Sequence, residues 1–402
     1  MSDWIKCSLC DIASYVTDRV NVLDLTIDTY ISTENLVADR GGMIPATKLP
    51  NVNVVPSYQQ NDILISNIRP YFKKIWLAHS MGGCSNDVLV IRANTTCDSK
   101  YLYYLLSTDD FFDYATKTSK GTKMPRGDKK AIMNYPVILP PLPIQKKIAA
   151  ILSSLDDKIE INTRMNKVLE EIARALFHRW FVEFEFPNDE GKPYKSSGGR
   201  MIESEMGEIP EGWRVGTLDE IAKITMGQSP SGTSYNEQGT GTVFYQGRAE
   251  FGFRYPSRRL YTTEPKRMAE KGDVLLSVRA PVGDINIANE PCCIGRGLAA
   301  IQSIDNYSSF IYYLMLDLQK TLDSFNGEGT VFGSINRISL ASLIIVLPPD
   351  SYLELFEPIA RNLDLLIEKN SLENINLQIM RNSLLSILMS GELFVADFSD
   401  VK

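Results

Sequence analysis

The chain has 402 residues, a net charge of −7 and a hydrophobic fraction of 44%, a composition typical of soluble globular proteins with two or more domains. No apolar run reaches the roughly 18 residues of a membrane span, and the first residues do not resemble a signal peptide, so the sequence predicts a cytoplasmic protein without membrane contact. The negative charge excludes a chain that is basic throughout, but a local basic surface remains compatible with it.

Two halves of the chain carry the same short motifs in the same order. Trp4 returns as Trp213, and further pairs are 101–105 with 310–314, Gly121-Thr122 with Gly329-Thr330, and Leu139-Pro-Pro with Leu347-Pro-Pro. The offset stays between 208 and 211 residues, far above the roughly 20–50 residues of solenoid repeats. We therefore expect two similar domains related by an approximate two-fold, which suits duplex DNA as a partner. A duplicated enzyme domain is the alternative.

Residues 1–142 are expected to form the first domain, of mixed α/β type. Short β-branched runs at Asp62–Ser66 and Asp87–Ile91 predict strands. A long helix is then expected in 143–186, because apolar residues recur three and four apart from Ile148 to Leu176 and no Gly or Pro interrupts 144–186. A helix of about 35 residues would be about 50 Å long.

The second half repeats this order. Residues 187–212 are rich in Gly, Pro and charge and indicate a linker, 213–350 the second mixed domain, and 351–391 a second long helix interrupted near its start by Pro358. Residues 392–402 remain as a C-terminal tail. The predicted fold class is α+β, with two similar globular domains, two long helices and a pseudo-two-fold repeat.

The two helices match at an offset of 208, so that Leu155 corresponds to Leu363 and Leu169 to Leu377. This spacing is typical of a coiled coil, in which a buried Asn sets the register at some cost in stability. The apolar stripe is interrupted at Asn162, Asn166, Asn370 and Asn374. An antiparallel pairing would bring these four side chains together; the alternative is that they face solvent. Paired helices would form a spacer of fixed length.

Motifs of catalysis are absent from the sequence. It has two His residues, no GxxxxGK[ST] loop for ATP and no Asn/Asp-Pro-Pro-aromatic motif of an adenine methyltransferase. Cys7 and Cys10 would supply only half of a zinc site, so we expect no metal site and interpret the cysteines as buried thiols. No catalytic pattern recurs in both halves, and the chain is expected to lack catalysis.

Cations concentrate in two segments, which we interpret as DNA-contacting loops because Arg and Gln read bases while Lys mainly binds phosphates. In the first half the candidates are Lys73, Lys74, Lys117, Lys120, Lys123, Arg126, Lys129 and Lys130. In the second half they are Gln246, Arg248, Arg254, Arg258, Arg259, Arg279, Arg296 and Arg337. Ordinary solvated surface charge is the alternative for each of them.

The order of motifs resembles one family. Gly207–Trp213, Leu218–Ala222 and Gly227–Gly232 are similar to the start of a target recognition domain, and Leu139–Ala149 with Leu176–Phe181 resembles the central conserved helical region of the specificity subunit of type I restriction–modification systems. The second copy departs from this pattern, since Asp350-Ser-Tyr-Leu-Glu replaces Leu-Pro-x-Gln.

The resemblance implies a non-catalytic subunit that recognises a bipartite, asymmetric sequence in double-stranded DNA, each domain reading one half while the helices set the spacer. It also implies two methyltransferase subunits and restriction subunits as partners, with S-adenosylmethionine, ATP and Mg²⁺ bound by those partners and no cofactor in this chain. Two alternatives remain: an enzyme that acts on DNA alone, and a coiled-coil scaffold that does not bind DNA.

Overall fold

The computed structural model describes residues 4–327 and 333–393. The second Gly-Thr motif, Gly329-Thr330, and all but the first two residues of the predicted tail lie outside the described residues. The chain divides into two compact units, which we call unit 1 (Met1–Asn162 with Leu372–Lys402) and unit 2 (Thr163–Ser371). Each unit contains one mixed domain and a segment of each long helix, so the units divide within the helices and not at the predicted linker.

The domain of unit 1 contains two four-stranded sheets. The first, in the order β2-β9-β6-β7, consists of Ala13–Tyr15, Val88–Ala93, Ile63–Ser66 and Ile75–Leu77, and all its pairs are antiparallel. The second, in the order β3-β5-β8-β4, consists of Arg19–Asn21, Val54–Tyr58, Gly82–Cys84 and Tyr30–Ile31, with β4 and β8 parallel. A third antiparallel pair joins β1 (Ile5–Ser8) to β10 (Pro136–Leu139).

Short helices complete unit 1: α1 (Leu9–Ile12), α2 (Ser99–Leu106), α3 (Asp109–Lys117) and α4 (Lys129–Met133), with 3-10 turns η1 (Val22–Asp24) and η2 (Pro70–Phe72). Their starts follow from the sequence, because Asp98, Thr108 and Asp128 accept hydrogen bonds from the first backbone amides of α2, α3 and α4. All four residues of β6 are buried, as expected for a central β-branched strand.

Unit 2 repeats this architecture. One sheet has the order β14-β22-β19-β20, from Ala222–Met226, Leu298–Ser303, Val274–Ser277 and Ile285–Ile287. The other has the order β15-β17-β16-β21-β18, from Tyr235–Asn236, Tyr261–Thr262, Thr242–Tyr245, Cys292–Ile294 and Met268–Ala269, with β16 and β21 parallel. β13 (Arg214–Thr217) pairs with β23 (Ile344–Leu347), as β1 pairs with β10 in unit 1. The helices are α6 (Ser308–Asp317), α7 (Gln319–Asp323) and α8 (Arg337–Ala341), and the 3-10 turns are η4 (Leu218–Glu220), η5 (Gly232–Ser234), η6 (Arg248–Glu250) and η7 (Ser324–Asn326).

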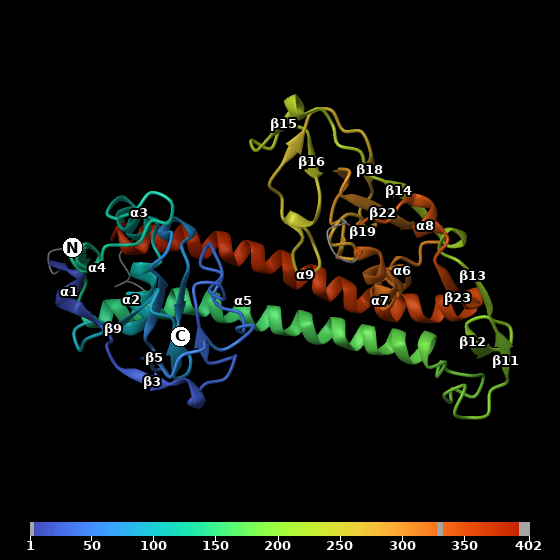
Figure 1. The fold of residues 1–402 in the computed structure, drawn as a ribbon, viewed down its shortest axis with the longest axis horizontal. Coiled ribbons are helices and arrows are strands. Elements are labelled where there is room, and N and C mark those ends of the chain that lie inside the picture. Colours follow the sequence, from blue (N-terminus) through green and yellow to red (C-terminus); the bar gives the residue numbers. More distant parts are fainter. Residues whose placement is uncertain (1–3, 328–332, 394–402) are drawn as a thin grey trace. The chain divides into compact units, whose positions relative to one another are not determined.

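The two long helices are α5 (Leu142–Phe177), which continues into a π-helical turn at His178–Val182, and α9 (Asp350–Met389). In each unit a segment of α9 lies antiparallel to a segment of α5 (Figure 1). In unit 1, Asn162 Nδ2 donates to Asn374 Oδ1 at 3.0 Å, and in unit 2, Asn370 Nδ2 donates to Asn166 Oδ1 at 3.0 Å. Asn162, Asn166 and Asn370 are buried, so these three side chains do not face solvent.

The predicted fold class is confirmed, with two local corrections. Pro358 does not interrupt α9, which is continuous from Asp350 to Met389. A proline inside a helix removes one backbone hydrogen bond and its ring crowds the preceding turn. The apolar neighbours Leu353, Phe356 and Ala360 are buried in the core of unit 2, and this packing offsets the cost. The predicted linker is also partly regular, because β11 (Met201–Ser204) and β12 (Gly207–Pro210) form a hairpin.

The cores lie where each domain meets its helical segments. In unit 1, Ile148, Leu152 and Leu385 share a cluster with the α2 side chains Leu102 and Leu105. In unit 2 an aromatic cluster joins the end of α5 to α6 and α9: the ring of Phe181 lies 4.9 Å from Phe310 and 5.0 Å from Phe356, measured between ring centroids. Within the described residues no helix has the length and apolar content that crossing a membrane requires.

Candidate nucleic-acid interface

The basic loop of unit 1 is an ordered structure between α3 and α4. Lys120 and Arg126 form an antiparallel bridge, with amide-to-carbonyl distances of 2.9 and 2.8 Å. The loop is also tied to the turn between β6 and β7, since Arg69 N donates to Pro125 O at 2.8 Å and Gly127 N donates to Asn67 O at 3.0 Å. The backbone therefore holds the cationic side chains in a defined place.

All six cations of this loop are exposed: Lys117, Lys120, Lys123, Arg126, Lys129 and Lys130. Lys120 pairs with Asp128 at 2.5 Å and Arg126 with Asp87 at 3.0 Å. Lys120 is the main reason that the pKa of Asp128 lies below its ordinary value. In the described part of the chain no ion pair involves Lys117, Lys123, Lys129 or Lys130. These four carry charge that an anionic partner could neutralise.

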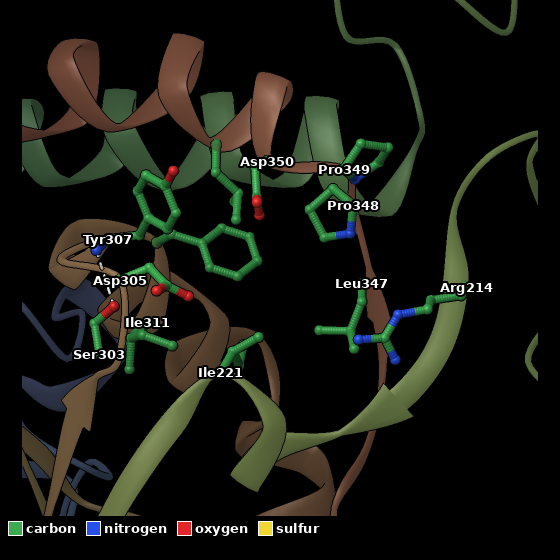
Figure 2. Close-up of a pocket in the computed structure, with 12 residues that line it drawn as sticks. Arg214, Ile221, Ser303, Asp305, Tyr307, Ile311, Leu347, Pro348, Pro349 and Asp350 are labelled. Atoms are coloured by element: carbon green, nitrogen blue, oxygen red, sulfur yellow. Dashed lines mark hydrogen bonds between the residues drawn. The ribbon is translucent and has the colours of Figure 1, made fainter.

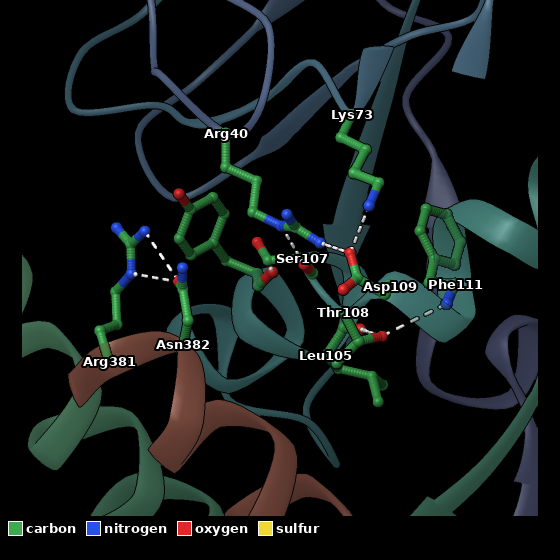
Figure 3. Close-up of polar contacts among 10 residues, drawn as sticks. Arg40, Lys73, Leu105, Ser107, Thr108, Asp109, Phe111, Arg381 and Asn382 are labelled. Atoms are coloured by element: carbon green, nitrogen blue, oxygen red, sulfur yellow. Dashed lines mark hydrogen bonds and ion pairs between the residues drawn. The ribbon is translucent and has the colours of Figure 1, made fainter. Parts of the chain in front are cut away.

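Lys73 and Lys74 are less available. Figure 3 shows Lys73 and Arg40 converging on Asp109, and the Lys73 Nζ lies 2.6 Å from the carboxylate. Hydrogen bonds from Lys73 and Arg40 lower the pKa of Asp109. Lys74 Nζ donates to the carbonyl of Thr33 at 2.6 Å. Both lysines are half-buried, so a phosphate would have to compete with partners already in place.

Two aromatic residues beside this loop were not among the predicted contacts. Tyr71 and Phe72 are 47% and 39% exposed, in a turn whose flanking residues Arg69 and Lys73 both have left-handed backbone angles. Such non-glycine conformations are unfavourable and gather at functional sites. Aromatic side chains within a cationic surface can stack on bases. Pro-Tyr-Phe followed by two lysines was the sequence signal that could have indicated them.

In unit 2 the fold brings Gln246, Arg279 and Arg296 to one edge. β16 and β21 are parallel, so the residues that follow them lie at the same end, and Gly297 N donates to Gln246 O at 3.2 Å. Val278 N, next to Arg279, donates to Gly297 O at 2.9 Å. The three side chains are exposed. An amide and two guanidinium groups at one edge are suited to reading base edges.

The same bridge recurs in both copies with the arginine on opposite sides. In unit 1 an isolated bridge joins Ile68 to Arg126, and in unit 2 it joins Arg279 to Ser334, the matching positions of the repeat. The helix that follows starts with an exposed cation in both units, Lys129 in α4 and Arg337 in α8. The repeat therefore preserves a cationic site while varying the side chains around it.

The remaining arginines of unit 2 are engaged with carboxylates. Arg248 pairs with Asp284, Arg258 with Glu290 (Nη2 to Oε2, 3.0 Å) and Arg259 with Glu250, although all three arginines are exposed. The hydrogen bonds that Arg258 and Arg259 donate to Glu290 and Glu250 raise the pKa values of the two arginines. We correct the prediction for Arg254: its side chain is 0% exposed and its guanidinium contacts Asp364, so DNA cannot reach it.

The repeat also differs at the junction of domain and helix. In unit 1, Gln145 is buried and its amide donates to the carbonyls of Thr96 and Pro140 at 3.2 and 2.8 Å, while its Oε1 accepts from Asp98 N at 2.8 Å. In unit 2 the matching residue is Leu353. Figure 2 shows Asp305, Tyr307 and Pro348 around a cleft at this place. The cleft has a volume of about 300 Å³, and the amide of Tyr307 donates instead to the Ser303 hydroxyl.

The α6 amides of unit 2 also find a different acceptor. The carboxylate of Glu357 in α9 accepts from Ser309 N at 3.0 Å and Phe310 N at 3.1 Å. Burial raises the pKa of Glu357, while these amide hydrogen bonds act in the opposite direction. The departure from the Leu-Pro-x-Gln pattern is therefore accompanied by a second anchoring residue one helical turn later.

Groups suited to metal chemistry do not gather in the described residues: no cluster of three or more His, Cys, Asp and Glu side chains that could hold a metal occurs among them. Of the six cysteines, four are buried as expected, Cys7 is half-buried and Cys10 is exposed. Burial raises the pKa of Cys84, Cys97 and Cys292 to about 12, which keeps these thiols protonated.

Comparison with known proteins agrees with this arrangement. Residues 56–171 and 210–379 match the family model of the type I restriction modification DNA specificity domain. The chain is 36% identical over 336 residues to the putative type I restriction enzyme MjaX specificity subunit of Methanocaldococcus jannaschii, covering 80% of this chain and 74% of that protein. It is 23% identical over 473 residues to the type I restriction enzyme HindI specificity subunit of Haemophilus influenzae, covering 98% and 100%.

A solved structure supports the fold independently. The type I restriction–modification system S subunit from M. genitalium aligns with a TM-score of 0.60 at 16% identity, over 96% of both chains. At this identity the likeness concerns the fold alone. Together with the family match over most of the sequence, these findings show that the chain belongs to the family of type I restriction–modification specificity subunits, the non-catalytic components that carry the DNA specificity domain.

Proposed function

We propose that each domain reads one half of a bipartite, asymmetric sequence in double-stranded DNA. The observation that carries this proposal is the recurring cationic site, with Arg126 and Lys129 in unit 1 and Arg279 and Arg337 in unit 2. A shared site with different side chains is what two readers of different sequences require, because base identity is read by the individual donors and acceptors.

Within this proposal the side chains have separate roles. The lysines of the 117–130 loop bind phosphates, and their charge sets the register of unit 1 on the duplex. Arg126 in unit 1, and Gln246, Arg279 and Arg296 in unit 2, face base edges. The exposure of these four side chains supports the assignment.

We further propose that α5 and α9 act as a spacer between the two half-sites. The buried Asn pairs support it, because an Asn in a helical interface favours one register over its neighbours. A unique register gives the helices a defined length, and the unread spacer in the DNA would follow from that length.

The same helices carry the proposed docking sites for two methyltransferase subunits. In unit 1, Leu372, Ile375 and Ile379 form an apolar ridge on α9, and in unit 2, Met165, Val168 and Ile172 form one on α5; each residue is about half exposed. Both ridges have the same three-and-four spacing, which suits a partner helix. One ridge in each unit fits a partner present in two copies.

The chemistry then belongs to the partners. S-adenosylmethionine would be bound by the methyltransferase subunits. ATP and Mg²⁺ would likewise be bound by partner subunits, with ATP hydrolysed by the restriction subunits. We propose no cofactor for this chain. A scaffold that does not bind DNA is the alternative function, and it leaves the four unpaired lysines of unit 1 without a role.

The test is an exchange of domains in a complex with the methyltransferase subunits. Residues 1–142 are replaced by the matching domain of a relative with a different target, and the methylated sequences are mapped across a genome. The expected result is one altered half-site and one unchanged half-site. If both halves change together, or if the wild-type complex shifts a DNA duplex no better than the methyltransferase alone, the proposal is wrong.

A further inference from the structure

A hydrogen bond between a buried tyrosine and a half-buried aspartate recurs in both units. In unit 1 the Tyr104 hydroxyl donates to Asp156 Oδ2 at 2.6 Å, and in unit 2 the Tyr313 hydroxyl donates to Asp364 Oδ1 at 2.7 Å. The tyrosine lies in the first helix after the sheets, α2 or α6, and the aspartate in a long helix. The pair therefore fastens each domain to the helices.

The arginine that completes the cluster comes from a different part of the fold in each unit. In unit 1, Arg381 of α9 contacts Asp156, with Nη1 to Oδ1 at 2.7 Å, so the ion pair joins one long helix to the other. In unit 2, Arg254 contacts Asp364. Arg254 lies between η6 and β17, within the segment 246–260 that carries four of the nine arginines of residues 213–350. In unit 2 the aspartate of the tyrosine–aspartate pair therefore binds a loop of the recognition domain, whereas in unit 1 the matching aspartate binds the other long helix.

The environment of Arg254 explains why a charged side chain can be fully buried there. Its guanidinium lies over the ring of Tyr312 at 4.3 Å from the centroid, donates to the Tyr313 hydroxyl at 3.3 Å, and has Glu170 of α5 at 3.6 Å. Burial is the largest single effect on Arg254 and acts to lower its pKa, but the Asp364 carboxylate together with Tyr312, Tyr313 and Tyr255 outweighs it, and the pKa is raised. The side chain stays charged and bridges α5, α6 and α9.

Backbone contacts extend the anchor along the loop. Arg254 O accepts from Ile287 N at 2.9 Å, and the Asn286 side chain bonds both the amide and the carbonyl of Gly252 at 3.2 and 3.1 Å. Phe253, between these two anchored residues, is 50% exposed. Arg258, a few residues further on, is exposed as well. Arg254 is thus buried while Phe253 and Arg258 are exposed. This arrangement is expected of a binding loop, in which a buried residue fixes the orientation of the exposed side chains.

We propose that Arg254 is a positioning residue for the second half-site: by binding Asp364 on α9 and lying beside Glu170 on α5, it holds the 246–260 segment in the conformation that reads DNA. The proposal rests on the proposed function, since it needs a second half-site to be read. It assigns no DNA contact to Arg254 itself.

The test compares Arg254→Met with Arg381→Met, the matched change in unit 1, each assembled with the methyltransferase subunits. Competition binding measures discrimination against duplexes substituted in one half-site or the other. For Arg254→Met we expect discrimination against second-half substitutions to fall about tenfold, because a single base contact is worth that much or more. Discrimination at the first half should stay unchanged. Arg381→Met should not weaken one half selectively, because its ion pair joins helix to helix.

Two milder variants keep the test decisive where Arg254→Met fails to assemble. Arg254→Lys retains the charge and should lose less discrimination than Asp364→Asn, which removes the carboxylate that the guanidinium binds. An equal loss at both half-sites, or no loss at either with any of these variants, overturns the positioning role. Failure of the proposed function is recognised separately, because the wild-type complex would then discriminate at neither half-site.

Discussion

Arg126 and Arg279 occupy opposite sides of the same β-bridge in the two copies of the repeat. Arg126 pairs with Ile68 and is contributed by the basic loop, whereas Arg279 pairs with Ser334 and follows strand β19. The same backbone bridge thus carries an arginine in both units, but the arginine comes from the basic loop in unit 1 and from the segment after β19 in unit 2. Two domains related in this way can present similar charge and different hydrogen-bonding patterns to DNA.

This relationship predicts half-site effects for single alanine variants. Arg126→Ala should reduce discrimination at the first half-site and Arg279→Ala at the second, each by about 1–3 kcal/mol, the value of a direct base contact. Competition binding with half-substituted duplexes measures both. Lys195→Ala, an exposed cation outside either candidate site, serves as the control and should affect neither. Equal effects of Arg126→Ala on both halves would contradict a role as a local reader.

The exposed aromatic turn of unit 1 predicts a separate contribution. Tyr71→Ala should weaken binding of cognate duplex by about 1–3 kcal/mol if the ring stacks on a base or a base step, and Tyr71→Phe should bind like wild type because the stacking face remains. Equilibrium fluorescence anisotropy with labelled duplex provides the affinity. Identical binding by wild type and Tyr71→Ala would remove this turn from the interface.

Gln145→Leu copies into unit 1 the residue found in unit 2. It removes three hydrogen bonds and leaves Asp98 N and the carbonyls of Thr96 and Pro140 without this partner, at a cost of about 1–3 kcal/mol for each buried group left unpaired. Hydrogen exchange followed by mass spectrometry should show lower protection in α2 and unchanged protection in α6. Leu353→Met is the matched control. Full protection of α2 in the Gln145→Leu variant would refute the anchoring role.

The Asp109 cluster predicts a pH dependence of stability. Hydrogen bonds from Lys73 and Arg40 lower the pKa of Asp109 in the folded chain, so its contribution is present above the ordinary value of 3.8 and is lost as the pH falls through the lowered folded pKa. The contribution is small, below about 1 kcal/mol, because the carboxylate is exposed.

Urea unfolding of wild type and Asp109→Asn measures this dependence. The stability difference should stay constant from about pH 6 to about pH 4 and shrink as the pH falls below 3.8, and Asp110→Asn, which removes an exposed neighbour, should show no such trend. A difference that stays constant as the pH falls below 3.8 would mean that the cluster does not stabilise the ionised form.

The proposed spacer predicts the effect of lengthening the helices. One heptad inserted between Lys167 and Val168 and another between Glu368 and Lys369 keeps the Asn166–Asn370 pair intact and adds about 10 Å of helix. That length corresponds to about three base pairs at 3.4 Å each, and the extra turns rotate the helix by about 20°. Methylome sequencing should show a longer spacer, weaker methylation and unchanged half-sites.

The control for the spacer is an insertion in α5 alone. It shifts the facing residues of one helix against the other, so the complex should fail to assemble or to methylate. An unaltered spacer with full methylation in the double insertion would show that the length of α5 and α9 does not set the length of the DNA spacer.

The long helices, the two similar domains and the buried Asn positions could be predicted because each depends on a pattern of residues that lie close together or recur in the sequence. The period of the apolar residues indicated both long helices, and the order of motifs indicated two similar domains; α5 and α9 and the two sets of sheets agree with this. Asn162, Asn166 and Asn370 stood out because they interrupt an apolar stripe, and they are buried. Periodicity records which face of an element meets the core, so one sequence suffices to see it.

The availability of each cation was decided only by the tertiary structure. Arg254 and Arg258 are near neighbours in one basic segment, yet Arg254 is buried with its guanidinium over the Tyr312 ring and Arg258 lies at the surface paired with Glu290. Their partners come from elements distant in the sequence, Asp364 being 110 residues away. The sequence by itself determined the repeat and the helices, because these depend on the order of motifs and the period of apolar residues, and the resemblance of its motifs indicated the family. Which charges remain for DNA depends on long-range contacts between carboxylates and guanidinium groups, and those exist only in the folded chain.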